Sequence, residues 1–174
     1  MKIQLRPFTS ADADVVQELV SAREIAENTL TIPHPYPAGG AAEWIARHPA
    51  AFAENGDEHW AIVDGDRIVG AIALMARREH DRAELGYWIG VPYWNRGYAR
   101  EAVGEVLRRA FEEAHWQRVY AMHFTRNPSS GRVLLRNGLK HEGTLRQHIK
   151  KWGELLDVEM YGILRDEWLG SRRR

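Results

Sequence analysis

VPYWNRGYAR, residues 91–100, is the stretch that decides the fold we expect for this chain. It follows a strand-like apolar segment, residues 83–90, and it precedes apolar residues spaced i, i+3, i+4, i+7, as on one helix face. A helix start presents free N–H groups and a partial positive charge. Gly97 and Ala99 are small enough to let an anion approach the backbone, and Arg96 and Arg100 add charge. The stretch therefore predicts a pyrophosphate site.

Two common nucleotide-binding motifs are absent from the chain. There is no Gly-x-x-x-x-Gly-Lys-Ser/Thr, which excludes a P-loop. There is also no Gly-x-Gly-x-x-Gly after a predicted strand, which excludes the Rossmann fingerprint. The predicted pyrophosphate must therefore belong to a ligand that neither motif serves.

An antiparallel meander is predicted on the N-terminal side of this stretch. The hydrophobic period becomes strand-like from His59, and Asp64-Gly65-Asp66 is a hairpin turn signal. The chain then returns along residues 67–75, turns again at 77–81, and forms a third strand along 83–90. Three consecutive strands with short turns are expected to be neighbours in one sheet.

Helices and loops are predicted on both sides of the meander. Residues 1–7 form a first strand, and Thr9 and Ser10 then cap a helix, followed by helical stretches at 21–30 and 38–48. Three prolines make residues 32–37 a loop, which either covers a substrate with His34 and Tyr36 or serves as a rigid connector. Beyond the central stretch we expect helices at 99–114 and 129–136, and strands at 117–123, 139–148 and 154–164.

Composition limits the class of protein. The 174 residues predict one domain, residues 1–170, with a flexible basic tail at 171–174. The absence of cysteine excludes disulfides, Cys-ligated zinc and a cysteine nucleophile. The 24 basic residues balance the 24 acidic ones, so a general nucleic-acid footprint is not expected.

Membrane and metal sites are not expected either. No apolar run is long enough to span a membrane, and the first ten residues lack a signal-peptide core, so a cytoplasmic location is expected. His141-Glu142 begins a His-Glu-x-x-His zinc motif, but Leu145 stands where the second histidine would be.

The central loop resembles the acetyl-CoA loop of the GNAT acetyltransferase superfamily, Gln/Arg-x-x-Gly-x-Gly/Ala. Here the loop reads Trp94-Asn95-Arg96-Gly97-Tyr98-Ala99, so the two small positions match and Trp94 departs from the usual residue. That departure is common in the branch of RimJ/RimL-type N-terminal acetyltransferases, in which a Tyr-Trp pair precedes Gly-x-Gly-Tyr-Ala.

Two further blocks carry the same resemblance at the expected spacing. The segment Ala-Glu-Leu-Gly-Tyr-Trp-Ile, residues 83–89, is similar to a strand of that branch. Residues 127–146 match its run Asn-x-x-Ser, Val-Leu, Gly-Phe-x-x-Glu-Gly-x-Leu-Arg. The likeness extends from about residue 60 to residue 168, and residues 22–56 are generic, so acceptor choice is expected to lie there.

The resemblance implies an α/β (α+β) GNAT fold with a central mixed, mostly antiparallel sheet that is splayed between the Glu84 strand and the Val119 strand. Acetyl-CoA would lie in the splay, and its acetyl group would pass directly to a primary amine entering beneath the 33–37 loop. Main-chain groups at the end of the Glu84 strand would contact the pantetheine arm and the acetyl carbonyl. The implied cofactor-binding residues are Ile89, Gly90, Val91, Asn95, Arg96, Gly97, Tyr98, Ala99, Arg100 and Asn127.

Two side chains are candidates for proton transfer. Glu84 is a general base acting through water, or an exposed or arginine-paired carboxylate. Ser130 is the acid that protonates the leaving thiolate, or a hydroxyl at a helix start. Many GNAT enzymes place a tyrosine four residues further on, where this chain has Leu134. Asn127 either contacts pantetheine or caps a helix.

Several alternatives stay open at the level of sequence. The acceptor is a protein N-terminal α-amine or a small-molecule amine, including a polyamine-like one. An α-amine, with a pKa of ~7.7–8.0, needs less help from a base than a lysine amine at ~10.4. The rival from another class is a CoA-binding regulatory module without turnover. The sequence also leaves open whether the chain acts as a monomer or a homodimer.

Overall fold

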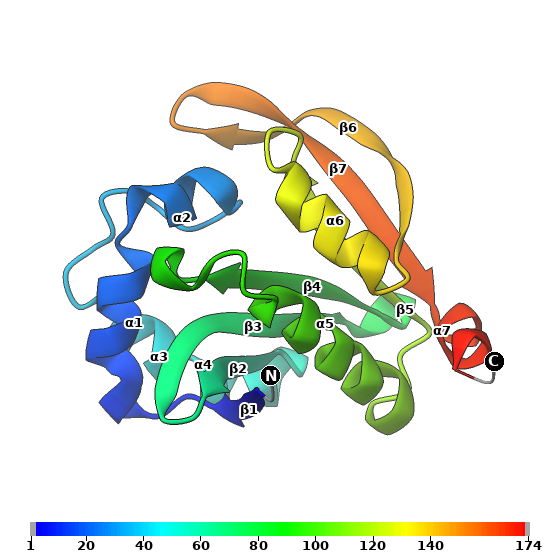
Figure 1. Ribbon diagram of the computed structural model, residues 1–174, viewed down its shortest axis with the longest axis horizontal. Helices are drawn as coiled ribbons and strands as arrows, with labels where there is room; N and C mark the ends of the chain where they lie inside the picture. The colour runs from blue at the N-terminus through cyan, green and yellow to red at the C-terminus, as the bar shows by residue number, and fades with distance from the viewer. Residues whose placement is uncertain (1–2, 173–174) are drawn as a thin grey trace.

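Seven strands form one mixed sheet in the computed structural model, which describes residues 3–172 (Figure 1). The spatial order is β1-β2-β3-β4-β5-β7-β6, and every neighbouring pair is antiparallel except β4 and β5. This is the mixed, mostly antiparallel sheet that the resemblance implies. The strands are β1 (Gln4–Pro7), β2 (Glu58–Asp64), β3 (Arg67–Arg77), β4 (Arg82–Ile89), β5 (Arg118–Phe124), β6 (Lys140–Lys151) and β7 (Glu154–Leu164).

The parallel pair β4 and β5 is joined over three residue pairs only. Arg82, Ala83 and Glu84 pair with Arg118, Val119 and Tyr120. Beyond Glu84, β4 runs on to Ile89 and β5 to Phe124 without further pairing. The two strands therefore diverge, and the predicted splay is confirmed.

Helices cover both faces of the sheet. The long helices α5 and α6 lie on one face, and the N-terminal helices lie on the other and beside the splay (Figure 1). The amphipathic spacing of α5 explains its place, because Ala102, Val103, Val106 and Leu107 are almost fully buried against the sheet. The helices are α1 (Ala13–Val20), α2 (Arg23–Asn28), α3 (Gly40–Ala46), α4 (His48–Asn55), α5 (Tyr98–Arg108), α6 (Pro128–Arg136) and α7 (Arg165–Ser171).

The predicted meander β2-β3-β4 is confirmed. Two helix predictions need correction. The α5 helix changes to a π-helical turn at Arg109–Glu113. Helix α4, which follows the predicted 38–48 helix, is absent from the sequence prediction, and none of its residues is buried. A helix without a buried stripe leaves no apolar period in the sequence.

The helix at the C-terminal end reaches one residue into the predicted tail. Ser171, the first residue of the predicted tail, is the last residue of α7, and the guanidinium of Arg172 lies 4.6 Å above the ring of Trp168. Met1, Lys2, Arg173 and Arg174 lie outside the described residues.

Two properties concern the described residues as a whole. None of the helices within residues 3–172 is long and apolar enough to cross a membrane. Within the same range, no three His, Asp or Glu side chains come together in a way that would hold a metal ion.

A stacked histidine pair joins α4 to the sheet. The rings of His48 and His59 are 4.2 Å apart and nearly parallel, and the edge of Trp44 meets both. Burial, followed by the nearby His59 and Arg47, lowers the pKa of His48 to about 4. The neutral form of His48 is therefore the one that the folded protein favours.

We expect stability to fall when the pH is lowered from about 6.5 to about 4. In this window the unfolded chain binds a proton at His48 that the folded chain does not bind, so the free energy of unfolding rises with pH. One such proton contributes a slope of up to about 1.4 kcal/mol per pH unit. Urea denaturation of the wild type and of His48→Phe across this window measures it. An identical pH slope in both proteins would contradict the assignment.

Candidate active site

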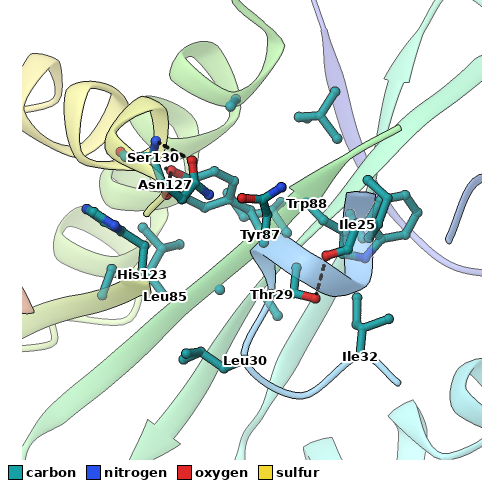
Figure 2. A pocket seen from close by; sticks show the side chains of 18 of the residues that line it. Ile25, Thr29, Leu30, Ile32, Leu85, Tyr87, Trp88, His123, Asn127 and Ser130 are labelled. Carbon is teal, nitrogen blue, oxygen red and sulfur yellow. Dashed lines mark hydrogen bonds between the residues drawn. The ribbon is translucent and has the colours of Figure 1, made fainter. Parts of the chain in front are cut away.

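A cavity of about 1060 Å³ fills the splay and extends to the N-terminal helices. Its walls come from α2 and the loop after it, from β4, from the α5 N-terminus, and from β5 and the start of α6. In Figure 2, Ile25, Thr29, Leu30 and Ile32 lie on one side, and Asn127 and Ser130 lie on the other. The cavity therefore joins the predicted cofactor site to the segment expected to choose the acceptor.

The loop before α5 has the backbone that an anion cradle needs. Gly97 is the N-cap residue of α5 at φ +86°, and Asn95 also has a positive φ, +61°. Both positions favour residues that tolerate the left-handed region. These two residues line the cavity together with Tyr98, Ala99 and Arg100. The start of α5, where N–H groups lack intrahelical partners, therefore lies on the cavity wall.

One residue of this loop is placed differently from the prediction. Arg96 is not among the residues that line the cavity, and its guanidinium lies 5.9 Å from the ring centre of Tyr93. The side chain of Tyr98 is buried, and its hydroxyl donates to Asp64 at 2.5 Å. Any cofactor contact at Tyr98 is therefore restricted to its backbone.

The end of β4 already uses several of its main-chain groups. The indole N–H of Trp94 donates to the carbonyl of Ile89 at 2.6 Å, and the N–H of Gly90 donates to the carbonyl of Val69 at 2.9 Å. Gly90 and Val91 are not among the cavity-lining residues, whereas Ile89 is. In this conformation the Gly90 N–H is not free to bind the acetyl carbonyl, and Ile89 can accept one further bond through its second lone pair.

The start of α6 brings together the two polar residues predicted there. Asn127 caps the helix, because its Oδ1 accepts from the N–H of Ser130 at 3.3 Å. The hydroxyl of Ser130 lies 2.7 Å from the hydroxyl of Tyr87 on β4. Since the N-cap bond uses only the oxygen, the Asn127 Nδ2 is left to donate into the cavity.

Glu84 stands where the splay opens. It is the last β4 residue that pairs with β5, and it lines the cavity. Its Oε2 accepts from the Tyr120 hydroxyl at 3.1 Å and lies 3.6 Å from a guanidinium nitrogen of Arg77. The prediction that Glu84 pairs with an arginine is therefore confirmed. The ion pair leaves Glu84 on the cavity wall, so it does not exclude a role as base.

Comparison with known proteins now fixes the family. Residues 2–140 match the family described as an acetyltransferase (GNAT) domain. The chain belongs to the GNAT acetyltransferase family. It is an acetyltransferase, and its acetyl donor is acetyl-CoA.

Three similar proteins illustrate the range of this family. An uncharacterized N-acetyltransferase of Bacillus subtilis, YoaA, is 30% identical over 172 residues, which cover 94% of each chain. A putative ribosomal N-acetyltransferase of the same organism, YdaF, is 32% identical over 119 residues, covering 68% of this chain and 64% of YdaF. A spermidine N-acetyltransferase from Vibrio cholerae, solved with CoA and spermine, superposes with a TM-score of 0.83 at 21% identity, covering 96% of this chain and 98% of that one.

Sequence reasoning missed two residues of the acetyltransferase site. Strand alternation places Tyr87 on the face of β4 opposite Glu84, but it does not indicate the bond of Tyr87 to Ser130. Burial raises the pKa of Tyr87 to about 12, and the Ser130 bond opposes this only in part. Strand alternation could have indicated this contact, because it puts Tyr87 on the face of β4 that carries α6, the helix of Ser130.

His123 is the second residue that sequence reasoning missed. Its Nδ1 lies 2.8 Å from the carbonyl of Phe124, and because a carbonyl only accepts, Nδ1 carries the proton. Burial lowers the pKa of His123, so the ring is neutral. Its Nε2 is buried and has no hydrogen-bond partner among the described residues. His123 lines the cavity, and its Nε2 is covered by Gly131 of α6 and by the Tyr161 hydroxyl.

Proposed function

We propose that this enzyme acetylates a primary α-amine, either a protein N-terminus or a small amino-acid-like molecule, in preference to a polyamine. The charge of the cavity carries this proposal. Its lining includes two carboxylates, Glu43 and Glu84, against four arginines outside the CoA cradle, at positions 47, 126, 132 and 136. A polyamine brings several positive charges, and a surface with an excess of arginine repels them.

The apolar wall of the cavity agrees with a singly charged acceptor. Ile25 and Trp88 are buried in the wall, and Ile32, Tyr36 and Trp44 pack against the same cluster. Such a wall suits the side chain or backbone of a peptide N-terminus or an amino acid. The similarity to YdaF, a putative ribosomal N-acetyltransferase, supports the RimJ/RimL-type interpretation.

In the proposed reaction the amine attacks the thioester carbonyl carbon directly. The C–N bond forms, the C–S bond breaks, and CoA leaves as a thiolate. The excess proton on nitrogen passes through water to Glu84 on the acceptor side of the splay. The absence of cysteine from the chain excludes an acetyl-cysteine intermediate.

The leaving thiolate would be protonated through the Ser130–Tyr87 pair. The two hydroxyls are 2.7 Å apart, and the raised pKa of Tyr87 keeps its proton in place at neutral pH. A thiol with a pKa of ~8.5 needs only modest help.

We expect Glu84→Gln to lower kcat by about tenfold or more at pH 6, with a smaller loss at pH 9. At low pH the base must remove the amine proton, whereas at high pH the acceptor arrives already deprotonated. The pH–rate profile measures this, and Glu79→Gln, at an exposed turn position, is the control. Parallel profiles for wild type and Glu84→Gln would remove Glu84 as base.

A panel of acceptors tests the proposed function. Free CoA released from acetyl-CoA is detected with 5,5′-dithiobis(nitrobenzoate) in the presence of ribosomal-protein N-terminal peptides, free amino acids, and spermidine. We expect the highest kcat/KM with an α-amine. A higher kcat/KM for spermidine than for every α-amine would overturn the choice of acceptor.

The rival interpretation is a CoA-binding module without turnover. It would be favoured by acetyl-CoA binding in a calorimeter with no thiol release from any amine. One observation supports this rival. Glu84 and Ser130 already form hydrogen bonds within the protein, to Tyr120 and Tyr87, which is what purely structural roles would require.

A further inference from the structure

The acceptor side of the cavity is built on a short segment that has little support of its own. Residues 25–32, the end of α2 and the loop after it, contribute Ile25, Asn28, Thr29, Leu30, Thr31 and Ile32 to the wall. Helix α2 is only six residues long, and a helix of that length is not stable by itself. Something outside the segment must therefore hold it in place.

Lys151 supplies most of that support. It is the last residue of β6, at the tip of the β6–β7 hairpin, and this tip lies near α2 (Figure 1). Its Nζ donates to the carbonyls of Ala26, Thr29 and Ile32 at 2.5, 2.5 and 2.9 Å. These carbonyls belong to the end of α2 and to the loop after it, where helix groups lack intrahelical partners.

The geometry requires Lys151 to be charged. Burial lowers the pKa of this lysine, whose exposed fraction is 7%. Even so, three carbonyl acceptors need three N–H donors, and only the ammonium form provides them. The cation also lies 5.9 Å from the ring of Phe124 and 5.2 Å from that of Trp152, and the negative end of the α2 dipole favours it.

A second cation reinforces the same segment from a neighbouring element. Arg126, in the loop between β5 and α6, donates to the carbonyl of Glu27 at 2.8 Å. Its guanidinium lies 5.0 Å from the ring of Phe124. Both cations thus come from the C-terminal half of the sheet, and both bind main-chain oxygens of the N-terminal half.

We propose that Lys151, assisted by Arg126, is a positioning residue that sets acceptor affinity by holding residues 25–32 across the splay. The inference rests on the proposed function, because it takes this wall to be the acceptor site. Lys151 is not among the cavity-lining residues, so it acts through the segment that it holds. The CoA cradle at Gly97 belongs to a different element, so holding the segment affects acceptor binding and leaves acetyl-CoA binding unchanged.

The test compares Lys151→Met with Lys150→Met. Methionine keeps an unbranched apolar chain and removes all three donors. Lys150 is the exposed neighbour on the same strand, so its variant controls for loss of charge at the hairpin. We expect Lys151→Met to raise KM for the amine by at least about tenfold, which is ~1.4 kcal/mol, and to leave KM for acetyl-CoA within twofold. Lys150→Met should change neither value.

Arg126→Met should give a smaller rise in the KM for the amine, because it breaks one main-chain bond and not three. Since Arg126 also lines the cavity, faster amide exchange of residues 25–32 in this variant is the readout that loss of a wall charge alone would not give. Arg126→Met also keeps the proposal testable if Lys151→Met does not fold. A KM for acetyl-CoA that rises in parallel, or a fall in kcat with the KM for the amine unchanged, would overturn the proposal.

Hydrogen–deuterium exchange separates this proposal from the proposed function, because it needs no turnover. Amides of residues 25–32 should exchange faster in Lys151→Met than in wild type or Lys150→Met. Unchanged exchange in this segment would overturn the inference whether or not an acceptor is acetylated. A wild type that acetylates no amine would overturn the proposed function instead.

Discussion

Gly97→Asp is expected to lower the affinity for acetyl-CoA by at least about 100-fold, which corresponds to ~2.7 kcal/mol. Gly97 caps α5 at φ +86°, and its neighbours on the helix start line the cavity. A carboxylate at this position would stand beside the pyrophosphate. Two like charges 4 Å apart repel by about 4 kcal/mol at an effective dielectric constant of 20.

We expect Gly97→Asp to reduce the stability of the fold less than it reduces the affinity for acetyl-CoA. Aspartate is a favoured N-cap residue and visits the left-handed region more readily than most residues. Gly97→Asn is the matched control, since it has nearly the same shape and no charge. Isothermal titration with acetyl-CoA measures both variants. An affinity within twofold of wild type for Gly97→Asp would refute the cradle, and equal losses in both would show that size and not charge is responsible.

Gly70→Ala should give the largest loss of stability, lowering the free energy of unfolding by about 3 kcal/mol or more. Gly70 on β3 pairs with Ile89 on β4. A Cβ added at Gly70 would overlap the carbonyl oxygen of Trp88 and would lie 3.0 Å from the Cα of Ile89. Both neighbours are backbone atoms, so no rotamer change relieves the contact and the end of β4 must move.

The end of β4 leads directly into the loop before α5, so the same variant should also weaken acetyl-CoA binding. Urea denaturation measures the stability, with Gly170→Ala as the control. Gly170 lies in α7, and a Cβ added there would meet no atom within 4 Å, so alanine should be neutral or stabilising. A Gly70→Ala protein within about 0.5 kcal/mol of wild type would contradict the close approach of the two strands.

The strand and helix pattern is predictable wherever one face of an element is buried. The meander from β2 to β4 follows from alternation and from the turn at Asp64-Gly65-Asp66. Helix α5 follows from its apolar face. Helix α4 buries no residue and so gives no signal. The short helix α7, Arg165–Ser171, is also missed, because it buries a single residue, Trp168.

The candidate site is predictable only where it consists of local backbone. The Gly97 loop and the N-cap at Asn127 are set by short-range sequence, and both line the cavity. The resemblance implies free main-chain groups at Ile89, Gly90 and Val91, yet the N–H of Gly90 is bonded to Val69 on the neighbouring strand. Pairing between strands decides such a bond, and the local sequence of the loop does not contain it.

The sequence by itself determined the order of the seven strands along the chain, the absence of a cysteine intermediate, and the helix start that resembles an acetyl-CoA cradle. Tertiary structure alone decided which groups meet. Tyr87 and Ser130 are 43 residues apart and share a hydrogen bond, and Lys151 binds carbonyls more than 100 residues away. Local propensity acts over one or two turns of chain, whereas these contacts exist only after the splayed sheet has brought its two halves together.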